Sequence, residues 1–113
     1  MSDNKSTNNI NGAGTETYTE EIIQVKKPDL YRIILLNDDY TPRDFVVWLL
    51  MTVFYLNENE SNRIMLEAHT KGKSIIGTFS YDIAKTKLLQ VENLCEKYEH
   101  PLKCILEVVS GDN

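Results

Sequence analysis

Two short polar stretches hold the residues of this 113-residue chain whose side chains and spacing could do chemistry. They are residues 37–42 (NDDYTP) and residues 69–73 (HTKGK). Asp38, Asp39 and His69 are oxygen and nitrogen ligands of the kinds that divalent metals use, and a carboxylate beside an imidazole also suits general acid–base catalysis. Asn and Asp are equally the usual residues of turns, so a purely structural role stays open at this point.

Other motifs of catalytic and cofactor-binding proteins are incomplete in this sequence. Residues 72–74 (GKS) resemble the end of a phosphate-binding loop, but that motif needs glycine where this chain has Glu67, and it needs a helix after the loop. Neither Cys95 nor Cys104 lies near a predicted helix start that would lower the pKa of a nucleophilic thiol. We therefore predict two reduced, buried thiols, no metal, no cofactor and no catalytic residue.

Composition narrows the class of partner. The residues are 42% hydrophobic and 26% charged, which is typical of a single globular domain, and the net charge of -5 argues against nucleic acid. The longest apolar run, residues 45–56, is about half as long as a bilayer requires. Residues 1–14 are polar and predict no signal peptide. We expect a cytoplasmic protein that binds neither nucleic acid nor a membrane.

The hydrophobic pattern divides the chain into a tail and one core domain. Residues 1–27 are rich in Asn, Thr and Glu, with one apolar cluster near Ile22, and predict a disordered N-terminal tail. Residues 28–113 predict a single domain with strands at 30–36, 74–79 and 102–109.

Three helices are expected between these strands. The first covers about 42–56, with Thr41 as its cap, Pro42 in its first position and Asp44 in capping-box spacing. The second begins at 57–60 and ends at Gly72, and the third follows a cap at Ser80. The order β-α-α-β-α-β predicts an α+β fold: a three-stranded antiparallel sheet with three helices packed on it.

Several motifs recur along the folded part in an order that a known family shares. They are NDDYTP at 37–42, Phe45-Val46, Met65-Leu66, His69, Lys71-Gly72-Lys73, Gly77 with Phe79, residues 84–87 (AKTK) and residues 99–102 (EHPL). From Tyr31 to Val108 the sequence resembles the ClpS family of protease adaptors. The resemblance implies the same three-stranded sheet with helices that the hydrophobic pattern predicts.

The resemblance also implies a function. Family members bind the exposed first residue of a substrate, typically Leu, Phe, Tyr or Trp, and deliver it to the ClpA unfoldase of the ClpAP protease. The resemblance places Asn37, Asp39 and His69 around the α-amino group of that first residue. That group is mostly an ammonium with three donors near neutral pH, so it needs converging acceptors. The implied chain is a monomeric, non-catalytic adaptor whose partners are N-degron substrates and the N-terminal domain of a ClpA-type unfoldase.

A neighbouring pocket is implied for the first side chain. Arg43 stands at its rim where many relatives carry Met, and position 68 is Ala where some carry Val, so the preferred first residue stays open. An unfoldase-facing surface is implied at the start of the third helix, at Tyr81, Asp82 and Lys87. The pocket residues implied by the resemblance are Asp38, Thr41, Pro42, Arg43, Val46, Met65, Ala68 and Leu102.

Two alternatives remain at this stage. A small hydrolase could use Asp39 and His69 as base and orienting group, although the sequence offers it no nucleophile or metal site. A non-catalytic structural domain with a similar order of strands and helices is the other alternative. In that protein, Asp39 and His69 would have no part in partner binding.

Overall fold

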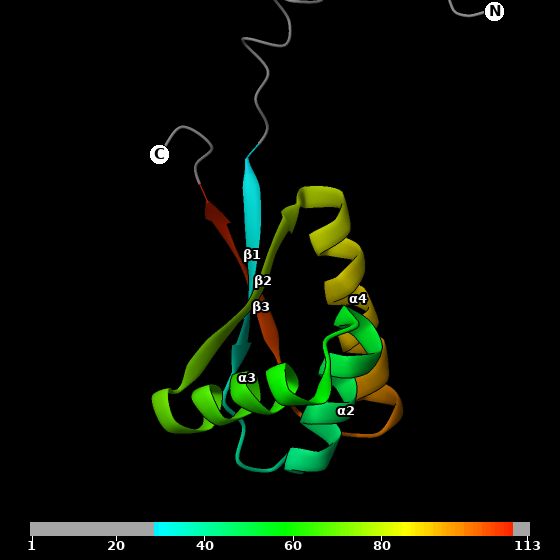
Figure 1. Cartoon of the computed structure of the whole chain (residues 1–113). Coiled ribbons are helices and arrows are strands. Elements are labelled where there is room, and N and C mark those ends of the chain that lie inside the picture. Colours follow the sequence, from blue (N-terminus) through cyan, green and yellow to red (C-terminus); the bar gives the residue numbers. More distant parts are fainter. Residues whose placement is uncertain (1–28, 110–113) are drawn as a thin grey trace, which may run out of the picture.

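A computed structural model describes residues 29–109 of the chain (Figure 1). The observed order β-α-α-β-α-β confirms the predicted α+β fold. The predicted tail, residues 1–27, lies outside the described residues. The elements are β1 (Leu30–Leu36), α2 (Arg43–Phe54), α3 (Glu58–Lys71), β2 (Lys73–Ser80), α4 (Tyr81–Lys97) and β3 (Cys104–Val109).

Strand β1 is the centre of the sheet. The strand order is β2-β1-β3, and both neighbours run antiparallel to β1. Ile33 pairs with Gly77 on one side and Leu106 on the other. The register with β2 shifts between Ile33 and Ile34, so that Ile76 is an extra residue in β2. This bulge lets Ile76 stay buried although the strand's alternation changes there.

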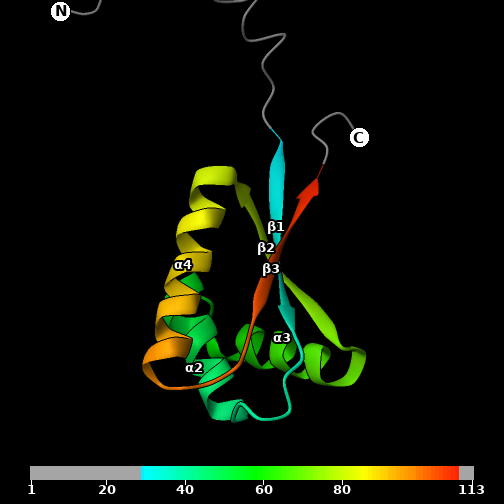
Figure 2. The same ribbon diagram turned by 180° about the vertical axis from the view of Figure 1, so that it is seen from behind.

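The helices cover one face of the sheet. Figures 1 and 2 show α2 and α4 on the same side of the strands, with α3 crossing near one end of the sheet. Helix α4 packs against all three strands, and α2 packs against α3 and α4. Each fully buried aliphatic side chain contributes about 1.5–3 kcal/mol through removal from water. Fully buried aliphatic residues come from every layer: Ile33, Leu35, Leu49, Leu50, Ile64 and Val91.

Both predicted signals at the ends of α3 are confirmed. The Asn57 side chain accepts a hydrogen bond from the Glu60 backbone N–H at 2.8 Å. Gly72 ends the helix with φ of 93°, and its N–H donates to the Ala68 carbonyl at 2.8 Å. Glycine adopts this left-handed conformation without the clash that a Cβ atom would cause.

The predicted cap of α2 is wrong. The helix begins at Arg43, and Pro42 occupies the cap position without a side-chain hydrogen bond. The Thr41 hydroxyl donates instead to the carboxylate of Asp38, so it stabilises the preceding turn. The structure shows no capping-box bond from Asp44 at this helix start.

Two smaller boundary predictions also need correction. Ser80 occupies the cap position of α4, but its side chain makes no capping hydrogen bond. Strand β3 begins at Cys104, two residues later than predicted. Near the end of this strand Val108 is 55% exposed, whereas Cys104 at its start is buried.

The two cysteines are free and buried, as predicted. Burial raises the pKa of the Cys104 thiol to about 12, and burial followed by the charge of Asp38 raises the pKa of Cys95. In an unfolded chain a thiol releases its proton near pH 8.5. Between these values the native state therefore holds more protons than the unfolded state, which lowers stability as the pH rises.

We predict that the free energy of unfolding falls between about pH 8 and pH 10, and that part of this fall is absent in Cys104→Ala. Urea unfolding with a reductant present measures both proteins. Identical pH slopes for the two proteins would contradict the assignment to this thiol.

Candidate functional site

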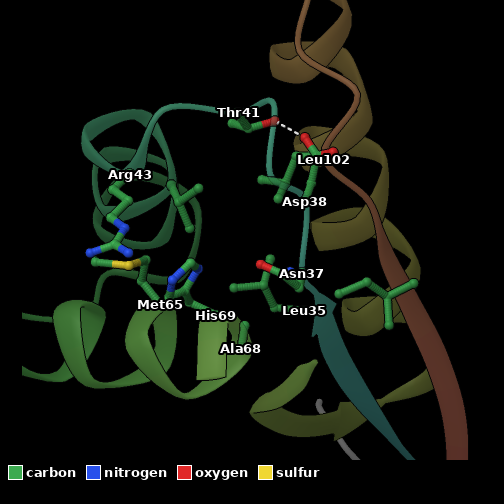
Figure 3. A pocket seen from close by; sticks show the side chains of 11 residues that line it. Leu35, Asn37, Asp38, Thr41, Arg43, Met65, Ala68, His69 and Leu102 are labelled. Carbon is green, nitrogen blue, oxygen red and sulfur yellow. Dashed lines mark hydrogen bonds between the residues drawn. The ribbon is translucent and has the colours of Figure 1, made fainter. Parts of the chain in front are cut away.

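A hollow lies where the end of β1, the start of α2, the second half of α3 and the segment before β3 meet (Figure 3). It contains about 300 Å³ of empty space, its open mouth included. Its wall combines buried aliphatic side chains with a polar and charged rim. The lining residues are Leu35, Leu36, Asn37, Asp38, Thr41, Arg43, Val46, Met65, Ala68, His69 and Leu102.

Two backbone hydrogen bonds bring these segments together. The Asn37 N–H donates to the Gly72 carbonyl at 2.9 Å, which joins the end of β1 to the end of α3. The Leu36 N–H donates to the Lys103 carbonyl at 3.1 Å, and this bond joins the end of β1 to the segment before β3. Neither bond uses a side chain, so the side chains of the loop remain free to face the hollow.

The polar rim is built around Asn37. Its amide nitrogen donates to the carboxylate of Asp39 at 3.2 Å, which leaves the amide oxygen of Asn37 as an acceptor. His69 in the last turn of α3 also lines the hollow, and its ring is exposed. Asp39 is exposed and does not itself line the hollow, so the structure connects it to the site through Asn37.

The apolar part of the wall comes from four elements. Val46 of α2, Met65 and Ala68 of α3, and Leu102 before β3 are each at most 8% exposed. These four residues were predicted. Leu35 was not, although it lies near the end of the apolar run 30–36 that directly precedes the polar loop, and that position was the available signal.

The remaining predicted pocket residues divide into two groups. Asp38 and Thr41 line the hollow and are hydrogen-bonded to each other, and Arg43 lines its mouth. Leu36 lines the hollow without having been predicted. Pro42, at the cap position of α2, is exposed and does not line the hollow.

The three residues assigned to the unfoldase surface lie elsewhere. Tyr81 and Asp82 begin α4, and the Tyr81 ring packs against Tyr31 with 5.1 Å between centroids. Lys87 Nζ donates to the Val53 carbonyl at 2.6 Å near the end of α2. Helix α4 has 17 residues, a length of roughly 25 Å, and its opposite end at Lys97 leads into the segment with Leu102, which lines the hollow.

The described part of the chain offers neither a metal centre nor a membrane span. Within residues 29–109, no group of three His, Cys, Asp or Glu side chains is arranged to hold a metal ion. None of the helices in this range has both the length and the apolar surface needed to cross a bilayer. The hollow itself is lined by hydrogen-bonding side chains, the Arg43 guanidinium among them, and by apolar side chains.

Comparison with known proteins identifies the family. The family described as "ATP-dependent Clp protease adaptor protein ClpS" matches residues 26–105 of this chain. The chain belongs to the ClpS family. A ClpS adapter protein of Hyphomonas neptunium is 46% identical over 101 residues, which cover 89% of this chain and 86% of that protein. The ClpS adapter protein of Leptospira biflexa is 49% identical over 83 residues, 74% of each chain.

A solved ClpS structure is also similar. The structure of Agrobacterium tumefaciens ClpS2 bound to L-phenylalaninamide superposes with a TM-score of 0.71 and is 38% identical in sequence. The match covers 74% of this chain and 100% of that chain. The ClpS fold and the family's adaptor character therefore apply to the present chain.

We predict that Gly72→Ala lowers the free energy of unfolding by about 1–2 kcal/mol, because alanine is strained at a φ of 93°. Gly72→Asn should lose less, since asparagine tolerates the left-handed conformation. Urea unfolding of both variants measures the difference. Equal losses for the two variants would contradict the explanation from backbone strain, because added side-chain bulk meets no atom within 4 Å of the new Cβ.

Proposed function

We propose that this chain is a cytoplasmic bacterial adaptor that binds substrates beginning with Leu, Phe, Tyr or Trp. It delivers them to the ClpA unfoldase of the ClpAP protease and performs no catalysis itself. The observation that carries this proposal is the combination of an apolar hollow with acceptors at its rim, in a member of the ClpS family. L-phenylalaninamide, which the structurally similar ClpS2 binds, presents one free α-amino group and one aromatic side chain.

The rim suits the α-ammonium group of a substrate. The Asn37 amide oxygen, the Asp39 carboxylate and a neutral ring nitrogen of His69 supply three acceptors for three N–H donors. Hydrogen bonds that involve a charged group contribute about 1.5–3 kcal/mol each. An acetylated terminus has no charge and only one N–H, so it leaves acceptors unpaired. This difference excludes internal peptide segments.

The hollow suits the first side chain. Burying a Leu or Phe side chain contributes about 1.5–3 kcal/mol, comparable with one charged hydrogen bond at the rim. The hollow is open to solvent at its mouth, so a first side chain can enter it from the rim. Met65 and Arg43 line the hollow with flexible side chains that can move without a change in the backbone.

The unfoldase surface is proposed at the opposite end of α4. Tyr81 and Asp82 are exposed there. Lys87 is half-buried, and its ammonium group donates a hydrogen bond to the Val53 carbonyl of α2. A monomer with these two separate surfaces can hold a substrate and contact the N-terminal domain of the unfoldase at the same time. Of the three residues, Asp82 has the side chain most available to a partner, because Tyr81 packs on Tyr31.

We predict that a labelled peptide with a free N-terminal Phe or Leu binds in fluorescence anisotropy and that its N-acetylated twin does not. The reason is the loss of the charge and of two donors on acetylation. Equal binding of the two peptides, or binding of neither, would contradict the proposed function.

We predict that Asp39→Asn and His69→Ala each weaken binding of the free peptide about ten-fold or more, because the first removes a negative charge beside the ammonium and the second removes a ring-nitrogen acceptor. Asp29→Asn is the matched control. It removes the same charge from an exposed position directly before β1, at the end of that strand opposite to Asn37. If the control loses as much affinity as Asp39→Asn, the acceptor role of Asp39 is wrong and general electrostatic attraction accounts for binding.

A further inference from the structure

One cationic side chain, Arg43, lines the mouth of the hollow. It is the first residue of α2, it is exposed, and Figure 3 shows its guanidinium on the same side of the hollow as Met65 and His69. Within residues 29–109, no carboxylate lies within ion-pair distance of this guanidinium. A cation in the first turn also opposes the helix dipole. The charge of Arg43 therefore has no evident part in stabilising the fold.

The surroundings of Arg43 are otherwise acidic. Asp38 and Asp39 precede it in the loop, and Asp44 follows it in the first turn of α2. Lys71, a cation in the last turn of α3, lies 3.9 Å from Glu67 Oε2. An acidic ligand approaching the mouth would meet repulsion from three carboxylates if Arg43 were absent.

We infer that Arg43 binds an acidic side chain at the second residue of a substrate. The inference rests on the proposed function. When the α-amino group lies against Asn37 and His69 and the first side chain fills the hollow, the rest of the substrate leaves through the mouth. There Arg43 offers a planar fork of N–H donors that matches the two oxygens of a carboxylate. The substrates favoured by this chain then begin with a large apolar residue followed by Asp or Glu.

The size of the effect follows from the exposure of Arg43. Ion pairs between exposed side chains change an equilibrium by about 1.5- to five-fold. Salt at about 1 M reduces the range of charge interactions to roughly 3 Å, so the preference should shrink there. Burial of the first side chain has no such dependence on salt.

Three peptides that differ only at the second residue test the inference: Phe-Glu, Phe-Gln and Phe-Lys at the free N-terminus of one common sequence. We expect the wild type to bind the Glu peptide about two- to five-fold more tightly than the Gln peptide at low salt, and the Lys peptide least tightly. In Arg43→Gln the order should invert, because Asp38, Asp39 and Asp44 remain. Lys85→Gln is the matched control, since it removes one positive charge at the far end of α4, and it should keep the wild-type order.

Two results would overturn the inference. One is a wild type that does not distinguish Glu from Gln, and the other is Arg43→Gln changing the affinity of all three peptides by the same factor. The second result would mean that Arg43 only shapes the entrance. Failure of the proposed function looks different, because then none of the three peptides binds more tightly than its N-acetylated form. Arg43→Glu, which should favour the Lys peptide, repeats the test with the opposite charge.

Discussion

The site depends on one hydrogen bond, from the Asn37 N–H to the Gly72 carbonyl. This bond ties the first residue of the polar loop to the residue at which α3 ends. It forms because Gly72 turns the chain through a left-handed conformation. Strand β2 can then begin at Lys73, paired with Leu36 of β1. The result is that the acceptors of the loop and the last turn of α3, with Ala68 and His69, lie on the same hollow. Backbone hydrogen bonds therefore hold the loop to α3, and the Asn37 amide oxygen is left as an acceptor for a ligand.

The rest of the fold keeps the walls of the hollow in place. Val46 reaches it from α2, whose C-terminal end is held to α4 by the bond from Lys87 Nζ to the Val53 carbonyl. Leu102 reaches it from the segment that the Leu36–Lys103 bond attaches to β1. An apolar cavity and a set of acceptors each bind weakly on their own. Together they require a ligand with an ammonium and a large apolar group on the same carbon, which only a free N-terminal residue of a protein provides.

Much of this arrangement could be predicted from the sequence, because its local signals agree with the tertiary structure. Asn57 and Gly72 mark the ends of α3 correctly, and the apolar runs mark all three strands. The prediction of the α2 cap failed because the Thr41 hydroxyl can bond either to the start of the helix or to Asp38. In the structure it bonds to Asp38 within the turn. Sequence spacing cannot rank such local hydrogen bonds against each other.

Features that depend on packing between distant segments were less accessible to prediction. The bulge at Ile76 follows from the pairing of β2 with β1, and the Phe79 ring lies where a Cβ at Gly77 would be, at 2.8 Å. The structural role of Lys87 depends on α2 ending beside α4, 34 positions away along the chain. The resemblance to ClpS supplied most site residues, but it could not show that Pro42 is absent from the lining of the hollow or that Leu35 and Leu36 line it.

The central claim is that this hollow binds a free N-terminal residue through both its amine and its side chain. Two-dimensional ¹H–¹⁵N NMR during titration with L-phenylalaninamide tests it most directly, with N-acetyl-L-phenylalaninamide as the control. The account predicts shifts of amide signals from residues 37–46, residues 65–69 and Leu102 with the free amine, and none with the acetylated compound. Equal shifts with both compounds would contradict it. So would shifts centred on the separate groove that Ile34, Ile75 and Glu107 line.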